Sequence, residues 1–228
     1  VVWSALVPNE RGLDRALAAG FPRIALFTAA TDSFCQRNIG MTVRESLALF
    51  RRLAARAREA GVQVRGYVST AFVCPFEGRV TPVRALEVAR ELLAMGAYEA
   101  SLGDTIGRAV PTDVARLIAA LPCDVPLDRL AFHFHDTRGA AAANVLAALQ
   151  EGAAVFDSAA GGAGGCPFAP GAAGNLATED LVCLLEGMGI RTGVDLAAVA
   201  AASRFLESRL GHPLPSRVLQ SLPASPGP

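Results

Sequence analysis

Short apolar segments alternate with longer amphipathic segments along most of this 228-residue chain. The apolar segments are rich in β-branched residues and predict strands, whereas the amphipathic ones have the periodicity and the Gly stops of helices. The expected strands cover residues 1–7, 23–28, 62–69, 98–105, 130–136 and 154–159. The expected helices cover residues 8–19, 41–60, 81–96, a segment beginning at Pro111, and residues 140–150, 177–188 and 196–210.

Repeated βα units predict an α/β fold, a parallel sheet covered by helices. Either an open doubly wound sheet or a barrel of eight units would fit. A barrel places functional residues at the ends of successive strands, and polar residues stand there in this chain: Thr28, Ser69, Asp104, His133 with His135, and Ser158. We therefore expect an incomplete TIM (β/α) barrel over residues 1–210, lacking about its first two units, and a partly disordered tail over residues 211–228.

Composition excludes several classes of protein. The 21 basic and 21 acidic residues balance, so the chain has no electrostatic footprint for nucleic acid. No apolar run approaches the ~20 residues of a membrane span, and the first residues lack the features of a secretory signal. The five cysteines are an odd number without framework spacing, which predicts free thiols in a reducing compartment. We expect a cytoplasmic protein, with the mitochondrial matrix as the alternative.

Two of the three histidines stand two residues apart in an expected strand, in the sequence AFHFHDT. Side chains two apart on a strand point to the same side, so His133 and His135 present two imidazoles together. This arrangement favours a divalent metal site over two structural histidines. Asp136 follows directly and would either orient an imidazole or cap the next helix.

A glycine-rich loop, GGAGGCPFAPGAAGN, supplies further candidates. Cys166 lies between Gly165 and Pro167, in a turn-rich segment of the kind that presents a reactive thiol and can move it. We therefore interpret the thiol as catalytic rather than incidental. Asn175 is either a carbonyl ligand for the metal or, like Thr178, a helix cap. With the histidines and the cysteine nearby, the ligand interpretation is favoured.

Other polar residues near strand ends complete the expected site. Asp104, in SLGDTIG, is either a helix cap or a titratable group that faces the substrate, and its position favours the second role. Hydrogen bonds to the substrate are expected from weaker candidates, namely Asn38, Tyr67, Ser69, Ser101 and Thr105.

These segments closely resemble the 3-hydroxy-3-methylglutaryl-CoA lyases, which belong to the DRE-TIM metallolyases. The resemblance runs through FTAATDSFCQRNI, RGYVS, CPFEG, MGAYEASLGDTIG and FHFHDTRG. It is most specific in GGCPFAPGAAGN, because other metallolyases keep the histidine pair but not this cysteine loop.

The resemblance implies a TIM barrel with Mg²⁺ or Mn²⁺ at its C-terminal face. The implied reaction cleaves 3-hydroxy-3-methylglutaryl-CoA to acetyl-CoA and acetoacetate, in leucine breakdown and ketone-body formation, with an acyl-CoA substrate and a homodimer as the analogous assembly. By the same resemblance His133, His135 and Asn175 are metal ligands, and His133 also carries a proton. Cys166 is the acid that protonates the departing carbanion, and Asp104 matches a catalytic aspartate.

Some positions differ from the family pattern. The Arg-Asp pair of the family's opening strand does not occur in this sequence, Arg138 replaces a tyrosine, and Thr70 replaces a cysteine. Three interpretations remain open: an N-terminally truncated lyase, a catalytically dead remnant that folds with another subunit, and a different DRE-TIM enzyme such as a Claisen-condensing synthase or an aldolase. We expect no significant lyase turnover from the chain as it stands.

Overall fold

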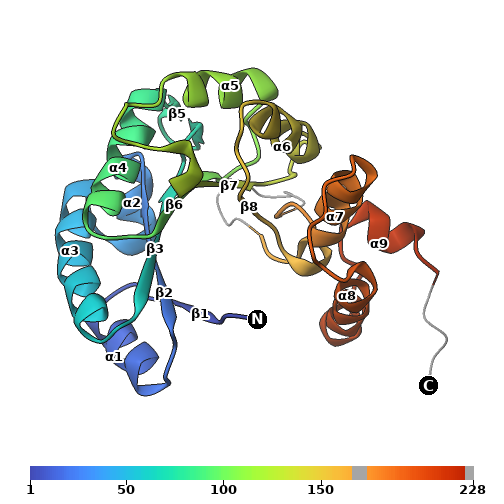
Figure 1. The fold of residues 1–228 in the computed structure, drawn as a ribbon, viewed down its shortest axis with the longest axis horizontal. Coiled ribbons are helices and arrows are strands. Elements are labelled where there is room, and N and C mark those ends of the chain that lie inside the picture. The colour runs from blue at the N-terminus through green and yellow to red at the C-terminus, as the bar shows by residue number, and fades with distance from the viewer. Residues whose placement is uncertain (166–173, 224–228) are drawn as a thin grey trace.

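Six parallel strands form one curled sheet in the computed structural model, which describes residues 1–165 and 174–223 (Figure 1). The order across the sheet is β1-β2-β3-β6-β7-β8, so each strand of the sheet pairs with the next one along the chain. The strands are β1 (Ser4–Leu6), β2 (Arg23–Ala29), β3 (Gln63–Ser69), β6 (Glu99–Asp104), β7 (Leu130–Phe134) and β8 (Phe156–Asp157).

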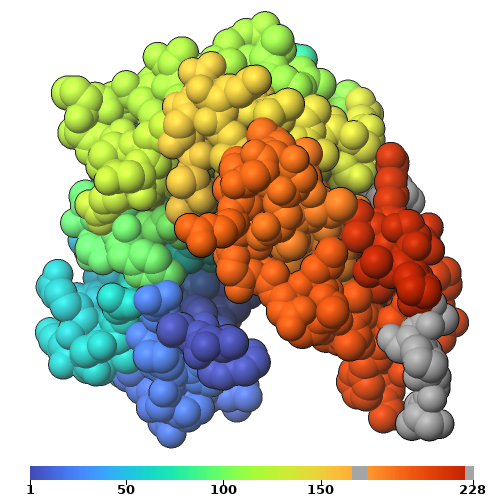
Figure 2. All heavy atoms as spheres, turned by 45° about the vertical axis from the view of Figure 1, so that its right-hand side comes forward, coloured from blue at the N-terminus to red at the C-terminus, as the bar shows by residue number. Residues whose placement is uncertain are grey.

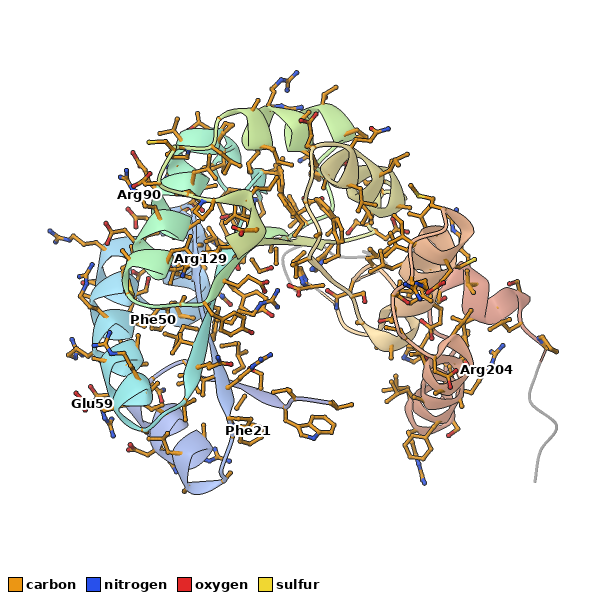
Figure 3. The ribbon with its side chains drawn as sticks, in the orientation of Figure 1. Phe21, Phe50, Glu59, Arg90, Arg129 and Arg204 are labelled. Carbon is orange, nitrogen blue, oxygen red and sulfur yellow. The ribbon has the colours of Figure 1, made fainter. Side chains whose placement is uncertain are left out.

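Helices lie outside the curve of the sheet, as the alternating pattern predicts (Figure 1). They are α1 (Glu10–Ala18), α2 (Asp32–Ile39), α3 (Val43–Glu59), α4 (Pro82–Ala94), α5 (Pro111–Ala119), α6 (Ala141–Gln150), α7 (Thr178–Gly187), α8 (Leu196–Leu210) and α9 (Arg217–Ser221). Their inner faces bury apolar side chains against the strands, such as Phe50 of α3, whereas the labelled Arg90 of α4 lies on the outer rim (Figure 3).

Local sequence signals explain where the best-defined helix begins. The Thr42 hydroxyl accepts a hydrogen bond from the Glu45 backbone N–H at 3.2 Å, and the Glu45 carboxylate accepts from the Thr42 N–H at 2.8 Å. This reciprocal capping box satisfies two helix-end donors, and it confirms the start expected for α3.

Four small elements were not expected from the sequence. Helix α2 and the antiparallel pair β4 (Val73–Cys74) and β5 (Gly78–Arg79) lie in segments between the expected units. Helix α9 lies within residues 211–228, where we expected a separate, partly disordered tail. Within the described part of this segment Leu214 and Leu219 are buried, and the Asp180 carboxylate of α7 accepts from Ser216 Oγ and Val218 N, both at 2.8 Å.

The two edges of the sheet, β1 and β8, do not pair with each other among the described residues. Figure 2 shows a hollow between the blue N-terminal segment and the orange C-terminal helices. Beside it the β1 segment carries exposed apolar side chains, including Trp3 at 71% and Leu6 at 63% exposure. No helix in the described ranges is both long and apolar enough to cross a membrane.

Close packing of α4 on β3 depends on a glycine. A Cβ added at Gly66 would lie 2.8 Å from Leu92 Cδ1 and 3.0 Å from Leu92 Cβ, and Leu92 is buried. Gly66→Ala therefore forces α4 away from the sheet, and we expect the free energy of unfolding in urea to fall by about 1–3 kcal/mol.

Gly187→Ala is the matched control, because a Cβ there meets nothing within 4 Å at the end of α7. We expect Gly187→Ala to be neutral or to stabilise by up to about 1 kcal/mol, since Ala is the better helix former. Equal effects of the two substitutions would contradict the packing argument.

Candidate active site at the carboxyl end of the sheet

The histidine pair converges as the two-residue spacing predicts. His133 lies in β7 and His135 directly follows it, with ring centroids 5.1 Å apart. Their Nε2 atoms are 3.2 Å apart. Two cis ligands of an octahedral cation at about 2.1 Å would lie about 3.0 Å apart, so this separation suits two ligands of one ion.

Burial keeps the second imidazole neutral. The His135 side chain is buried, and this burial, with His133 beside it, lowers the pKa of His135 to about 4. A neutral imidazole has a free lone pair at physiological pH, which is the form that coordinates a metal. His133 is more open, with 27% of its side chain exposed.

The segment after the glycine-rich loop returns to the end of β7. Asn175 forms an isolated antiparallel bridge with His135, and Leu176 N donates to Phe134 O at 3.1 Å. The Asn175 Nδ2 donates to Ala163 O at 2.9 Å, which leaves Oδ1 as the side-chain atom for a ligand role. The structure thus brings Asn175 beside the histidines, and the cap role considered for it is wrong, because Ala177 is the N-cap of α7.

Cys166 lies outside the described residues, as does the rest of the segment 166–173. The flanking residues approach each other closely, since a Cβ added at Gly174 would lie 2.2 Å from Gly164 O. Gly174 O also accepts from Asp136 N at 3.0 Å. The segment that carries Cys166 therefore begins and ends beside the histidine pair.

A pocket of about 200 Å³ opens in front of the two histidines. Three of the expected substrate-binding residues line it, namely Tyr67, Ser69 and Thr105, together with the apolar Leu6 and Phe27. Hydroxyl groups, imidazoles and an apolar wall thus meet at the carboxyl ends of the strands.

Two other expected substrate contacts lie elsewhere. Asn38 is exposed on α2 and does not line this pocket. Ser101 is buried and donates a hydrogen bond from its hydroxyl to Asp157 Oδ2 at 2.7 Å.

The strand-end hydroxyls of Thr28 and Ser158 form hydrogen bonds with helix side chains. Thr28 bonds to the Ser46 hydroxyl at 2.6 Å, and Ser158 bonds to the Thr178 hydroxyl at 2.9 Å.

Asp104 lies fully buried at the end of β6, where it holds a loop. Its two carboxylate oxygens accept from Arg108 N at 2.9 Å and Ala109 N at 3.0 Å. Burial nevertheless raises the pKa of Asp104 to about 6, although both N–H donors favour the carboxylate. The group thus titrates near neutral pH, next to the pocket residue Thr105.

Asp136 Oδ1 accepts from Ala141 N, the first backbone N–H of α6, at 3.0 Å, although the N-cap residue itself is Ala140. A different carboxylate, Asp157, lies beside His133 and was missed in the sequence. Its Oδ1 accepts from Arg65 Nη1 at 2.7 Å, and Arg65 also pairs with Glu99. The sequence did show an Asp within an expected apolar strand. Local periodicity could not reveal that its partner is a histidine 24 residues earlier.

The donors that converge are two imidazoles and an amide. Among residues 1–165 and 174–223, no group of three or more His, Cys, Asp or Glu side chains could hold a metal ion. The set fits part of the shell of a divalent cation, with His133 and His135 as cis ligands and Asn175 adjacent.

Comparisons with known proteins identify relatives over most of the chain. The model of the HMGL-like family matches residues 2–206. The mitochondrial hydroxymethylglutaryl-CoA lyase of Pongo abelii is 46% identical over 96% of this chain and 67% of that protein. The 3-hydroxy-3-isohexenylglutaryl-CoA/hydroxy-methylglutaryl-CoA lyase of Pseudomonas aeruginosa is 47% identical over 97% of this chain and 74% of that protein. The crystal structure of the HMG-CoA lyase of Bacillus subtilis has a TM-score of 0.94 and 44% identity, covering 97% of this chain and 74% of that one.

The raised pKa of Asp104 gives a pH signature in metal-free protein. A carboxyl group with a higher pKa in the folded than in the unfolded protein makes folding less favourable as pH rises. The free energy of unfolding then falls between the unfolded pKa and the folded pKa. Between pH 3.8 and about 6, this group should remove on the order of 3 kcal/mol from the free energy of unfolding. We expect Asp104→Asn to lack that loss when urea unfolding is measured at pH 4.5 and pH 7.5. An identical pH dependence in both proteins would contradict the shift.

Proposed function

The chain belongs to the HMGL-like family, and we propose that it acts in the cleavage of 3-hydroxy-3-methylglutaryl-CoA to acetyl-CoA and acetoacetate. The observation that carries the proposal is the convergence of the His133 and His135 Nε2 atoms at 3.2 Å, at the mouth of a pocket lined with hydroxyls. The names of the relatives support the substrate class, an acyl-CoA with a 3-hydroxyglutaryl group.

His133, His135 and Asn175 would hold the divalent cation, Mg²⁺ or Mn²⁺. When bound, the cation supplies Lewis-acid polarisation of the tertiary hydroxyl and of a neighbouring substrate oxygen. Hard cations prefer oxygen donors and carboxylates, so three neutral donors bind weakly by themselves.

The cleavage needs one base and one acid. His133 accepts the proton of the tertiary hydroxyl at Nε2, and in that step Nε2 would not also hold the cation, because an imidazole protonated at Nδ1 has a single lone pair. The C–C bond then breaks, its electron pair remains on the carbon of the departing acetyl-CoA, and a ketone forms on acetoacetate. Cys166 gives its thiol proton to that carbanion, from a loop that begins and ends beside the histidines.

The hydroxyls of Tyr67, Ser69 and Thr105 bind the oxygens of the substrate in this scheme. Asp104 contributes by position, because it fixes the loop after β6 that carries Thr105 and lies too deep to touch substrate. The exposed Asn38 and the buried Ser101 stay outside the proposed contact set.

The curled sheet would act as part of a TIM barrel. A barrel of eight units needs about two βα units beyond the six parallel strands described. We therefore propose that efficient turnover requires those further units, because they would wall the pocket on the side where Leu6 is now exposed.

The metal site can be tested by binding alone. We expect saturable Mn²⁺ binding, measured by the loss of the free-ion electron paramagnetic resonance signal. His135→Ala should weaken it at least about tenfold, since a cis ligand is removed. His212→Ala, at an exposed histidine beyond α8, should leave it unchanged. Similar losses in both variants would place the ion elsewhere.

The reaction can be tested by acetoacetate release. We expect no significant turnover from the chain by itself, and metal-dependent turnover after fusion to the part of the Bacillus subtilis lyase that it does not match. In that fusion Cys166→Ser should lower kcat at least about a hundredfold because the proton donor is lost, with Mn²⁺ affinity unchanged.

The exposed Cys123 provides the control, and Cys123→Ser should keep full activity. Turnover by the chain alone at the rate of the fusion would contradict the need for further units. A fusion that binds Mn²⁺ but releases no acetoacetate would contradict the lyase assignment.

A further inference from the structure

A charged network lies behind the site, and apart from the Tyr67 hydroxyl the proposed chemistry does not use it. Arg65 of β3 pairs through Nε with Glu99 at 2.5 Å and through Nη1 with Asp157 at 2.7 Å, and the Tyr67 hydroxyl also accepts from Nη1. Ser101 donates to the second oxygen of Asp157 at 2.7 Å. These groups are largely buried, with 13% of the Arg65 and 16% of the Asp157 side chain exposed.

Such a network is costly as a stabilising device. The desolvation cost of a buried ion pair is about as large as the attraction between its charges. Proteins in which apolar side chains replace such a pair are often equally stable. Arg65 Nη1 donates to one carboxylate oxygen of Asp157 at 2.7 Å, and Ser101 Oγ donates to the other at 2.7 Å. A fixed negative charge is therefore maintained at one place, under the His133 ring.

His133 has an unsatisfied atom that faces this charge. Its Nδ1 is buried and forms no hydrogen bond within the described part of the chain. Asp157 Oδ2 lies 3.5 Å away, slightly beyond hydrogen-bond length. Strand register explains the proximity, because His133 and Asp157 are direct partners in the β7·β8 ladder.

We propose that Asp157 is a positioning residue, which holds His133 through Nδ1–H so that the Nε2 lone pair faces the metal position. The inference rests on the proposed function and assigns a further residue to the same site. A ring proton fixed on Nδ1 leaves Nε2 unprotonated, which is the tautomer that a ligand or a base needs.

Asp157 is held in place, so the His133 ring is the group that turns to close the contact between them. Arg65 and Ser101 hold the two carboxylate oxygens, so the carboxylate cannot turn away. A small rotation of the imidazole shortens the 3.5 Å separation of His133 Nδ1 and Asp157 Oδ2 to a normal hydrogen bond and satisfies a buried donor. Catalytic hydrogen bonds commonly tighten in this way when the site is occupied.

Asp157→Asn tests the proposal with little change of shape. Arg65 only donates, so the new amide must turn its oxygen to Arg65 and its NH₂ to His133. Nδ1 must then accept, and the ring proton moves to Nε2, where it blocks the ligand position. We expect Mn²⁺ affinity to fall about 10–100-fold, as for loss of a residue that supports a metal ligand.

Nitrogen-15 NMR of the histidine rings reads the tautomer directly, independently of metal and turnover. In metal-free wild-type protein we expect the proton of His133 on Nδ1, and in Asp157→Asn on Nε2, with His212 unchanged. Glu99→Gln is the matched control, because it removes a charge from the same arginine without touching His133. It should retain the wild-type tautomer and bind Mn²⁺ within about threefold of wild type.

Two results would overturn the proposal. One is an unchanged His133 tautomer in Asp157→Asn, and the other is an equal loss of Mn²⁺ affinity in Glu99→Gln, which would reduce the network to a structural role. Failure of the lyase assignment would look different, since acetoacetate release would then be absent while the tautomer still followed Asp157. If Asp157→Asn does not fold, Ser101→Ala frees one side of the carboxylate, and we expect an intermediate His133 tautomer population.

Discussion

The hydrogen-bonded register of the parallel ladder is the constraint on which the site depends. It sets Arg65 opposite Glu99, Gly103 opposite His133, and His133 opposite Asp157. Because side chains alternate between faces, a slip of one residue would send each of these groups to the other side of the sheet. The glycine opposite the histidine lines the same pocket, and the aspartate lies 3.5 Å from the His133 ring on the neighbouring strand.

Neutral and charged side chains lie in two neighbouring layers of the site. At the mouth of the pocket, His135 stays neutral because burial lowers its pKa. One layer deeper, Arg65 and two carboxylates form ion pairs that remain charged. The Tyr67 hydroxyl joins the layers, since it accepts from Arg65 and lines the pocket. A cation entering this environment meets lone pairs in front and a fixed negative charge behind, an arrangement that strengthens imidazole as a ligand.

Local sequence signals predicted the elements that follow local rules. The α/β class, most strands and helices, and the histidine pair were found because periodicity, caps and two-residue spacing act over short distances. Asp157 was missed because its partners lie on three other strands, and Arg65 is 92 residues away. Asn38 and Ser101 show the opposite error, since polar residues near strand ends do not all face the pocket. Cys166 lies outside the described residues, so its role stays a prediction.

The exposed β1 edge has a spectroscopic consequence. The chain contains a single tryptophan, Trp3, and it stands at that edge, a few residues from the pocket-lining Leu6. An indole in water emits at longer wavelengths than one enclosed by apolar side chains. The intrinsic fluorescence of the protein is therefore a one-residue reporter, whose emission shifts to the blue when another polypeptide segment or a bound acyl chain covers β1.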